Sequence, residues 1–160
     1  MNYLKFTLIA GIVGTTFGLI PIPEDYKVDG LNKFGVNDTL YSGFMPLKFV
    51  DNKEGVYFFW LARQRQNMNI GKNLVIWLNG GPGCSSMTGM IFENGPFVVL
   101  DGASPGVYDL KYNPYSWNEA ADILYVDQPL RAGYSTAAAG ARTIYTEQEV
   151  AEDFHSFLLS

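Results

Sequence analysis

The chain has 160 residues, of which 48% are apolar and 17% are charged, and its net charge is −5 at pH 7. This composition can fill the core of at most one ordinary domain and excludes wholesale disorder. The acidic balance excludes a nucleic-acid groove, which needs clustered positive charge. One His and one Cys cannot build a zinc site, an iron–sulfur site or a disulfide framework, so we expect no metal and no cofactor.

The N-terminal residues 1–18 have the pattern of a cleaved signal peptide. Lys5 precedes an apolar run, and the small residues Thr16 and Gly18 suit a peptidase cut before Leu19. The run is shorter than the roughly 20 apolar residues that span a bilayer. An uncleaved anchor and a buried helix are the alternatives.

Such a peptide directs a chain to the secretory pathway. We therefore expect cleavage to release residues 19–160 there without stable membrane association, to be secreted or delivered to a vacuole or lysosome. There Asn37, in Asn37-Asp38-Thr39, is a candidate N-glycosylation site.

Several apolar segments predict strands. Residues 40–50 and 55–62 are rich in aromatic and β-branched side chains and flank a polar segment, 51–54, so they predict a hairpin. Residues 73–78 (NLVIWL) and 123–126 (ILYV) are apolar without interruption, which predicts strands buried on both faces of an α/β sheet. We expect the second of these strands to leave an open edge and an uncovered apolar surface.

Two segments predict helices. Residues 87–92 form a short Met-rich candidate, and Thr146 with Glu149 forms a capping box. The box opens a helix that is still running where the sequence stops at Ser160, and its apolar positions share one face: Val150, Phe154, Phe157 and Leu158. Strands with covering helices indicate the opening of an α/β fold.

The segment Asn79-Gly80-Gly81-Pro82-Gly83 directly follows the strand predicted at 73–78. Ligands of α/β sheets bind beyond the carboxyl ends of the strands, and free backbone N–H groups in such a loop can bind an oxyanion or a carboxylate. An ordinary tight turn is the alternative. A P-loop is excluded, because no Gly-Lys-Ser/Thr follows.

Two residues of types that hydrolases use for catalysis, Ser104 and His155, lie in local patterns that do not suit a catalytic role. Ser104 lies in a G-x-S-x-G pattern, but Pro105 has no N–H to donate to an oxyanion and no helix pattern follows, so we expect a turn serine. His155 falls off the apolar face of the last helix, which favours a surface position. These residues build no Ser–His–acid constellation.

Four segments match the serine carboxypeptidases in order and rough spacing: WLNGGPGCSS at 77–86, FENGP at 92–96, YNPYSWN at 112–118 and the DQP of VDQPLRAGYS at 126–135. The chain resembles this family, of the carboxypeptidase Y and secretory-pathway processing types, over about residues 40–160. The resemblance implies an α/β class, the N-terminal portion of an α/β-hydrolase fold with an incomplete sheet. Residues 19–160 would form the N-terminal part of the domain, truncated before the nucleophile elbow.

The family releases single residues from peptide C-termini with a Ser–Asp–His triad, and its nucleophile lies in a Gly-Glu-Ser-Tyr-Ala-Gly elbow that this sequence does not contain. The resemblance therefore implies a serine-type carboxypeptidase acting on peptide or protein C-termini, inactive as this chain alone. By resemblance, Asn79 and the Gly80 N–H hold the substrate carboxylate, Trp77 lines or hydrogen-bonds that site, and the Gly81 N–H is one oxyanion donor.

Glu93 would share a proton with a Glu of the elbow; a solvated charge at a helix end is the alternative. Cys84 pairs with a distant Cys in the family, so here it is an unpaired thiol or awaits a partner. Arg131 replaces a Gly of many relatives, and either favours acidic substrate side chains or points to solvent.

Two other functions were weighed. One is a secreted, non-catalytic remnant that binds peptide C-termini or nothing. The other, a lipase-type α/β-hydrolase, is disfavoured because lipases use a His-Gly-rich oxyanion loop where this chain has Asn79-Gly80-Gly81.

Overall fold

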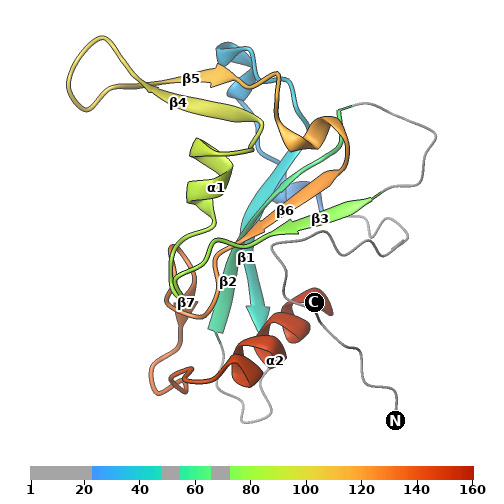
Figure 1. Cartoon of the computed structure of the whole chain (residues 1–160), viewed down its shortest axis with the longest axis vertical. Helices are drawn as coiled ribbons and strands as arrows, with labels where there is room; N and C mark the ends of the chain where they lie inside the picture. Colours follow the sequence, from blue (N-terminus) through green and yellow to red (C-terminus); the bar gives the residue numbers. More distant parts are fainter. Residues whose placement is uncertain (1–22, 48–54, 66–72) are drawn as a thin grey trace.

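The computed structural model describes residues 23–47, 55–65 and 73–160. Within them, a mixed five-stranded sheet has the order β1-β2-β6-β3, and the short strand β7 also pairs with β2 (Figure 1). Its strands are β1 (Leu40–Leu47), β2 (Gly55–Ala62), β3 (Leu74–Trp77), β6 (Asp122–Val126) and β7 (Thr136–Ala137). The signal peptide expected at 1–18 and the turn expected at 51–54 lie outside the described residues.

Strands β1 and β2 pair antiparallel, from Leu40 opposite Ala62 to Leu47 opposite Gly55, which confirms the predicted pairing. β6 is antiparallel to β2 and parallel to β3, with Trp77 opposite Tyr125. The parallel pair has its carboxyl ends at the same edge of the sheet, so the loops after Trp77 and after Val126 start side by side.

The two continuous apolar runs differ in burial. β6 lies between β2 and β3, and its residues Ile123, Tyr125 and Val126 are buried. The prediction of an internal strand is confirmed, whereas the prediction that β6 carries an open edge is wrong. All four residues of β3 are only half-buried, so the expected burial on both faces is wrong. The reason is its position, because within the described residues β3 pairs with β6 alone.

A second unit follows helix α1 (Met87–Phe92) as a two-stranded hairpin of β4 (Phe97–Asp101) and β5 (Tyr108–Tyr112) (Figure 1). The predicted helix is confirmed. Ser104 is exposed in the turn between β4 and β5, and its carbonyl accepts from the Val107 N–H, so the turn assignment is confirmed. Strand β5 was not predicted, because the Tyr- and Pro-rich segment 107–118 shows no clean periodicity.

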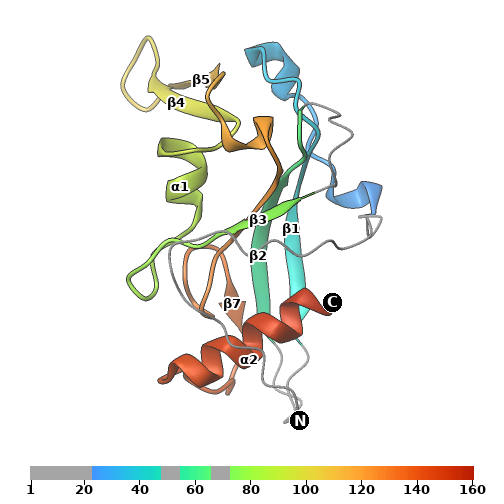
Figure 2. The same cartoon turned by 45° about the vertical axis from the view of Figure 1, so that its right-hand side comes forward.

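The sheet carries an apolar cluster on each face, because alternate residues of a strand point to opposite sides. Leu40, Ala62, Ile123 and Tyr125 pack with Met87 and Met90 of α1, whereas Tyr57, Phe59, Leu61 and Val126 pack with Phe157 of α2 (Glu147–Leu158). Figure 2 shows α1 and α2 lying at different levels along the sheet. Three short 3₁₀ helices complete the described elements: η1 (Glu24–Tyr26), η2 (Leu31–Phe34) and η3 (Trp117–Glu119).

The capping box of α2 is confirmed: Thr146 Oγ1 accepts from the Glu149 N–H, and the Glu149 carboxylate accepts from the Thr146 N–H. Phe157 is buried and His155 is exposed, as expected. Leu158 is 41% exposed and is the least buried of the four apolar positions predicted to share a face of this helix. In the part of the chain that the structure describes, no helix is long and apolar enough to cross a membrane.

Candidate functional site

The loop that follows β3 projects from the carboxyl edge of the sheet. Gly80 and Gly81 are exposed, and within the described residues neither of their N–H groups has a hydrogen-bond acceptor. Gly81 has φ +136° and Gly83 has φ +95°, a region that favours glycine. Two neighbouring N–H groups are therefore free for an external anion.

The carboxamide of Asn79 has a defined orientation. Its Oδ1 accepts from the Trp77 Nε1–H at 3.0 Å and from the Gly89 N–H at 3.1 Å, and its Nδ2 donates to Glu93 Oε1 at 3.1 Å. Both lone pairs of the oxygen are used, so one Nδ2 hydrogen is left for another acceptor. The structure thus brings Trp77, Asn79 and Glu93 together.

Helix α1 approaches this carboxamide closely at Gly89. A Cβ added to Gly89 would lie 2.2 Å from Trp77 Nε1 and 2.7 Å from Asn79 Oδ1, both closer than real Cβ contacts. Only glycine allows the helix backbone to donate to Asn79 at this point. Gly89 was not predicted as a site residue, because a glycine within a helix pattern gives no sign of what it approaches.

The turn that carries Glu93 is held in place by hydrogen bonds of the next residue, Asn94. Glu93 is exposed, but the next residue, Asn94, is buried and its Oδ1 accepts from the Tyr125 hydroxyl at 3.0 Å. Burial raises the pKa of Tyr125, so this phenol remains a donor. The Asn94 carbonyl accepts from Ser116 Oγ at 3.0 Å and from the Trp117 N–H at 3.1 Å, and the Trp117 ring meets Trp77 edge-on at 5.2 Å.

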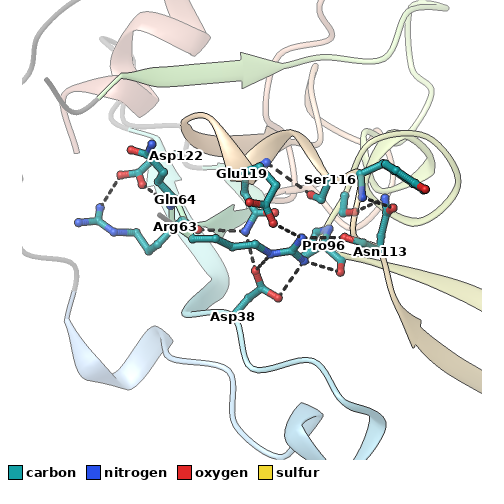
Figure 3. Close-up of polar contacts among 12 residues, drawn as sticks. Asp38, Arg63, Gln64, Pro96, Asn113, Ser116, Glu119 and Asp122 are labelled. Atoms are coloured by element: carbon teal, nitrogen blue, oxygen red, sulfur yellow. Dashed lines mark hydrogen bonds and ion pairs between the residues drawn. The ribbon is translucent and has the colours of Figure 1, made fainter. Parts of the chain in front are cut away.

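Arg65 joins segments that are distant in the sequence. Its partners Asp38, Pro96, Asn113 and Glu119 lie together in Figure 3. Its guanidinium donates to both carboxylate oxygens of Asp38, to Glu119 Oε1 at 3.0 Å, and to the carbonyls of Asn113 and Pro96 at 2.7 and 3.0 Å. All five N–H donors are used. Burial alone would lower the pKa of Arg65, but the hydrogen bonds to Asp38 and Glu119 raise it. Arg65 therefore fixes the chain just after the Glu93 turn.

A buried carboxylate, Asp127, lies where β6 ends. Its Oδ1 accepts from Ser85 Oγ at 2.7 Å and from the Ser86 N–H at 2.8 Å, and its Oδ2 accepts from the Tyr134 N–H at 2.9 Å. Asp127 is the first residue of the DQP segment at 127–129, but no role was predicted for it. No local pattern shows that the two loops it joins meet.

An apolar hollow of about 340 Å³ adjoins the loop. It lies between residues of helix α1 and of the loop after β6, and its walls include Ser85, Met87, Thr88, Ile91, Phe92, Gly133 and Tyr134. Ser85 is shared with the Asp127 network, so the hollow and the Asn79 loop are parts of one region.

The remaining predicted residues lie around this region. Cys84 is exposed and, within the described residues, unpaired. Arg131 is exposed with φ +74°, and its guanidinium donates to the carbonyls of Ala141 and Arg142. Its hydrogen bonds therefore go to a neighbouring loop and not to Asn79 or Glu93. Asn37 is exposed, and the described residues contain no group of three metal-binding side chains.

The sheet and the loop define an α/β protein with an anion-binding candidate at the carboxyl edge of a parallel strand. Comparison with known families assigns it further: the model of the serine carboxypeptidase family matches residues 30–160. The chain belongs to the serine carboxypeptidase family.

Individual relatives agree. The chain is 37% identical over 150 residues to carboxypeptidase Y homolog A of Paracoccidioides brasiliensis, covering 83% of this chain and 24% of the relative. It is 38% identical over 148 residues to a pheromone-processing carboxypeptidase of Zygosaccharomyces rouxii, covering 84% of this chain and 20% of the relative. It is 38% identical over 136 residues to serine-type carboxypeptidase F of Aspergillus niger, covering 84% of this chain and 24% of the relative. The chain thus spans about a quarter or less of the length of these relatives.

Proposed function

We propose that this chain forms the N-terminal part of a serine carboxypeptidase domain with the α/β-hydrolase fold, and that it supplies the site for the free carboxylate of a peptide C-terminus. The observation that carries the proposal is the Asn79 carboxamide. Its oxygen is occupied by Trp77 and Gly89, and its Nδ2 donates to Glu93 and keeps one hydrogen for another acceptor. The N–H of the next residue, Gly80, has no acceptor within the described residues.

Each group has a distinct task. Asn79 Nδ2 and the Gly80 N–H donate to the substrate carboxylate, and Trp77 orients Asn79. Glu93, when it shares a proton with a second carboxyl group, lets the site hold the substrate carboxylate without charge repulsion. The Gly81 N–H donates to the oxyanion that forms at the scissile carbonyl. The apolar hollow beside α1 would take the side chain of the released residue and favours an apolar one.

The location proposal follows the same family. We infer that the chain enters the secretory pathway, is glycosylated at Asn37 and is secreted or delivered to a vacuole or lysosome. The exposure of Asn37 supports this, because a glycan needs a surface position.

The chain alone should not hydrolyse peptides. The 160 residues contain no Gly-Glu-Ser-Tyr-Ala-Gly elbow, and His155 is exposed on α2. We expect no release of C-terminal residues and no labelling by a fluorophosphonate, measured by mass spectrometry of the labelled protein. Covalent labelling at Ser85, Ser86, Ser104 or Ser135 would overturn this expectation.

The carboxylate site is tested by binding. Because Glu93 has no proton-sharing partner within the described residues, the test uses the neutral variant Glu93→Gln, whose side-chain oxygen can still accept from Asn79 Nδ2. This chain should bind an N-acetylated dipeptide with a free C-terminus more tightly than the matching C-terminal amide, measured by calorimetric titration. Asn79→Ala should weaken binding of the free acid by roughly ten- to a hundredfold, because a hydrogen bond to a charged group is worth about 1.5–3 kcal/mol. The amide should be affected much less.

Asn32→Ala is the matched control, since Asn32 is exposed in η2. It should change neither affinity. If Asn79→Ala weakened the acid and the amide equally, Asn79 would have no part in carboxylate recognition.

A further inference from the structure

Asp127 is fully buried, and within the described residues no Lys, Arg or His forms an ion pair with it. Its charge is held by three donors alone: Ser85 Oγ–H, the Ser86 N–H and the Tyr134 N–H. The first two belong to the loop that begins at Asn79, and the third to the loop after β6. A buried carboxylate is costly unless it is well hydrogen-bonded, so these donors are tightly coupled to its position.

Ser86 carries this coupling to the candidate site. Ser86 is 1% exposed, its N–H donates to Asp127, and its Oγ donates to the Val126 carbonyl at 2.6 Å. The same Oγ accepts from the Asn79 N–H at 3.2 Å. The backbone of Asn79 is therefore held by a hydrogen bond to Ser86, and Ser86 is held by hydrogen bonds to Asp127 and to the last residue of β6.

We propose that Asp127 is a positioning residue that, through Ser86, holds Asn79 and the Gly80 N–H in the orientation that binds a peptide carboxylate. The inference rests on the proposed function, which it deepens. It also assigns a purpose to Gly133, whose absent Cβ would lie 2.0 Å from Asp127 Oδ2. Glycine at this position lets the second loop close onto the carboxylate.

The two carboxylate oxygens explain why an amide cannot replace Asp127. Oδ1 faces the Ser86 N–H and Oδ2 faces the Tyr134 N–H, so both positions need an acceptor. An asparagine has one acceptor and one donor group, and in either orientation its NH₂ meets a backbone N–H. Asp127→Asn therefore breaks the bridge between the loops with almost no change of volume.

The test is amide hydrogen exchange of the 160-residue chain, resolved by residue. Asp127→Asn should increase exchange at Asn79 and Ser86 by roughly tenfold beyond the change seen at the amides of β1 and β2. Asp122→Asn is the control, because Asp122 also accepts from a backbone N–H, that of Gln64 at 2.7 Å, at the opposite end of β6. Its local effect should be confined to the region of Gln64, and exchange at Asn79 and Ser86 should rise no more than at the amides of β1 and β2.

A purely structural role for Asp127 predicts that Asp127→Asn likewise raises exchange at Asn79 and Ser86 no more than at the amides of β1 and β2, and that result would overturn the proposal. If Asp127→Asn fails to fold, Ser85→Ala serves instead, because it removes one donor and leaves the two backbone donors. It should raise exchange selectively at Ser86 and Asn79 by about threefold. Unchanged exchange at both amides would contradict the positioning role.

Peptide binding distinguishes the proposed carboxylate site from the proposed positioning role of Asp127. Asp127→Asn and Ser86→Ala should each weaken the acetylated dipeptide acid by about tenfold, and the double variant should lose much less than the product of the two. Independent, fully multiplicative losses would contradict the relay. If the Glu93→Gln chain binds acid and amide equally, the proposed function fails, whereas the selective exchange at Asn79 still decides the role of Asp127.

Discussion

Arg65→Leu is expected to lower the free energy of unfolding by about 3–5 kcal/mol, the cost of breaking a buried ion pair. The variant leaves Asp38, whose side chain is 2% exposed, without its cation, and it removes the donors to the carbonyls of Asn113 and Pro96. The loss should be measured by urea unfolding, where the slope of the transition shows whether the native state is still compact.

Arg63→Leu is the matched control, because Arg63 lies two residues away and pairs with Asp122 at 3.0 Å with 27% of its side chain exposed. It should cost less than Arg65→Leu, because the Arg63–Asp122 pair is only half-buried and therefore keeps part of its hydration. Adding Asp38→Leu to Arg65→Leu should recover part of the loss, because the second change removes the unpaired buried charge. Equal losses for Arg63→Leu and Arg65→Leu would show that the Arg65 cluster contributes no more than a surface pair.

Gly89→Ala is expected to weaken the candidate site although the substituted residue belongs to helix α1 and not to the Asn79 loop. The new Cβ would lie 2.2 Å from Trp77 Nε1, so the indole must move, although it also packs edge-on against the Trp117 ring. Displacing Trp77 removes one of the three hydrogen bonds that orient the Asn79 carboxamide. We expect affinity for the free-acid dipeptide to fall by roughly tenfold or more, with a stability loss of about 1–3 kcal/mol from overpacking.

Helix propensity alone predicts that Gly89→Ala raises the stability of the chain, because alanine in a helix interior is more favourable than glycine by about 1 kcal/mol. Gly106→Ala is the control: Gly106 has φ +80° and open space around it in the β4–β5 turn. It should lower stability through backbone strain and leave the affinity unchanged. A Gly89→Ala chain that is more stable and binds the free acid normally would contradict the described contact.

The sequence predicted the elements that repeat a local pattern. The β1–β2 hairpin, the internal strand β6 and the capped helix α2 all follow from apolar runs and a capping box of neighbouring residues. The edge position of β3 was not predictable, because four consecutive apolar residues look the same in an internal strand and in an edge strand.

The candidate site divides in the same way. Trp77, Asn79 and Glu93 were named from the resemblance, and the structure adds the Gly89 contact that orients them. The Arg65 cluster was missed because its partners Asp38 and Glu119 lie 27 and 54 residues away in the sequence. Each is an ordinary charged residue until the fold brings them together. Asp127 was visible in a motif, but its bridging role depends on two loops that only the sheet places side by side.

The central claim is that the Asn79 loop binds a peptide C-terminal carboxylate. The most direct test is a ¹⁵N chemical-shift titration of the 160-residue chain carrying Glu93→Gln, which removes the negative charge beside Asn79, with an N-acetylated dipeptide acid and, separately, with its amide. The account predicts that the acid shifts the Trp77 indole N–H, the Asn79 side-chain amide and the backbone N–H groups of Gly80 and Gly81, and that the amide shifts them far less. Equal shifts with both ligands, or shifts with the acid confined to other parts of the chain, would contradict it.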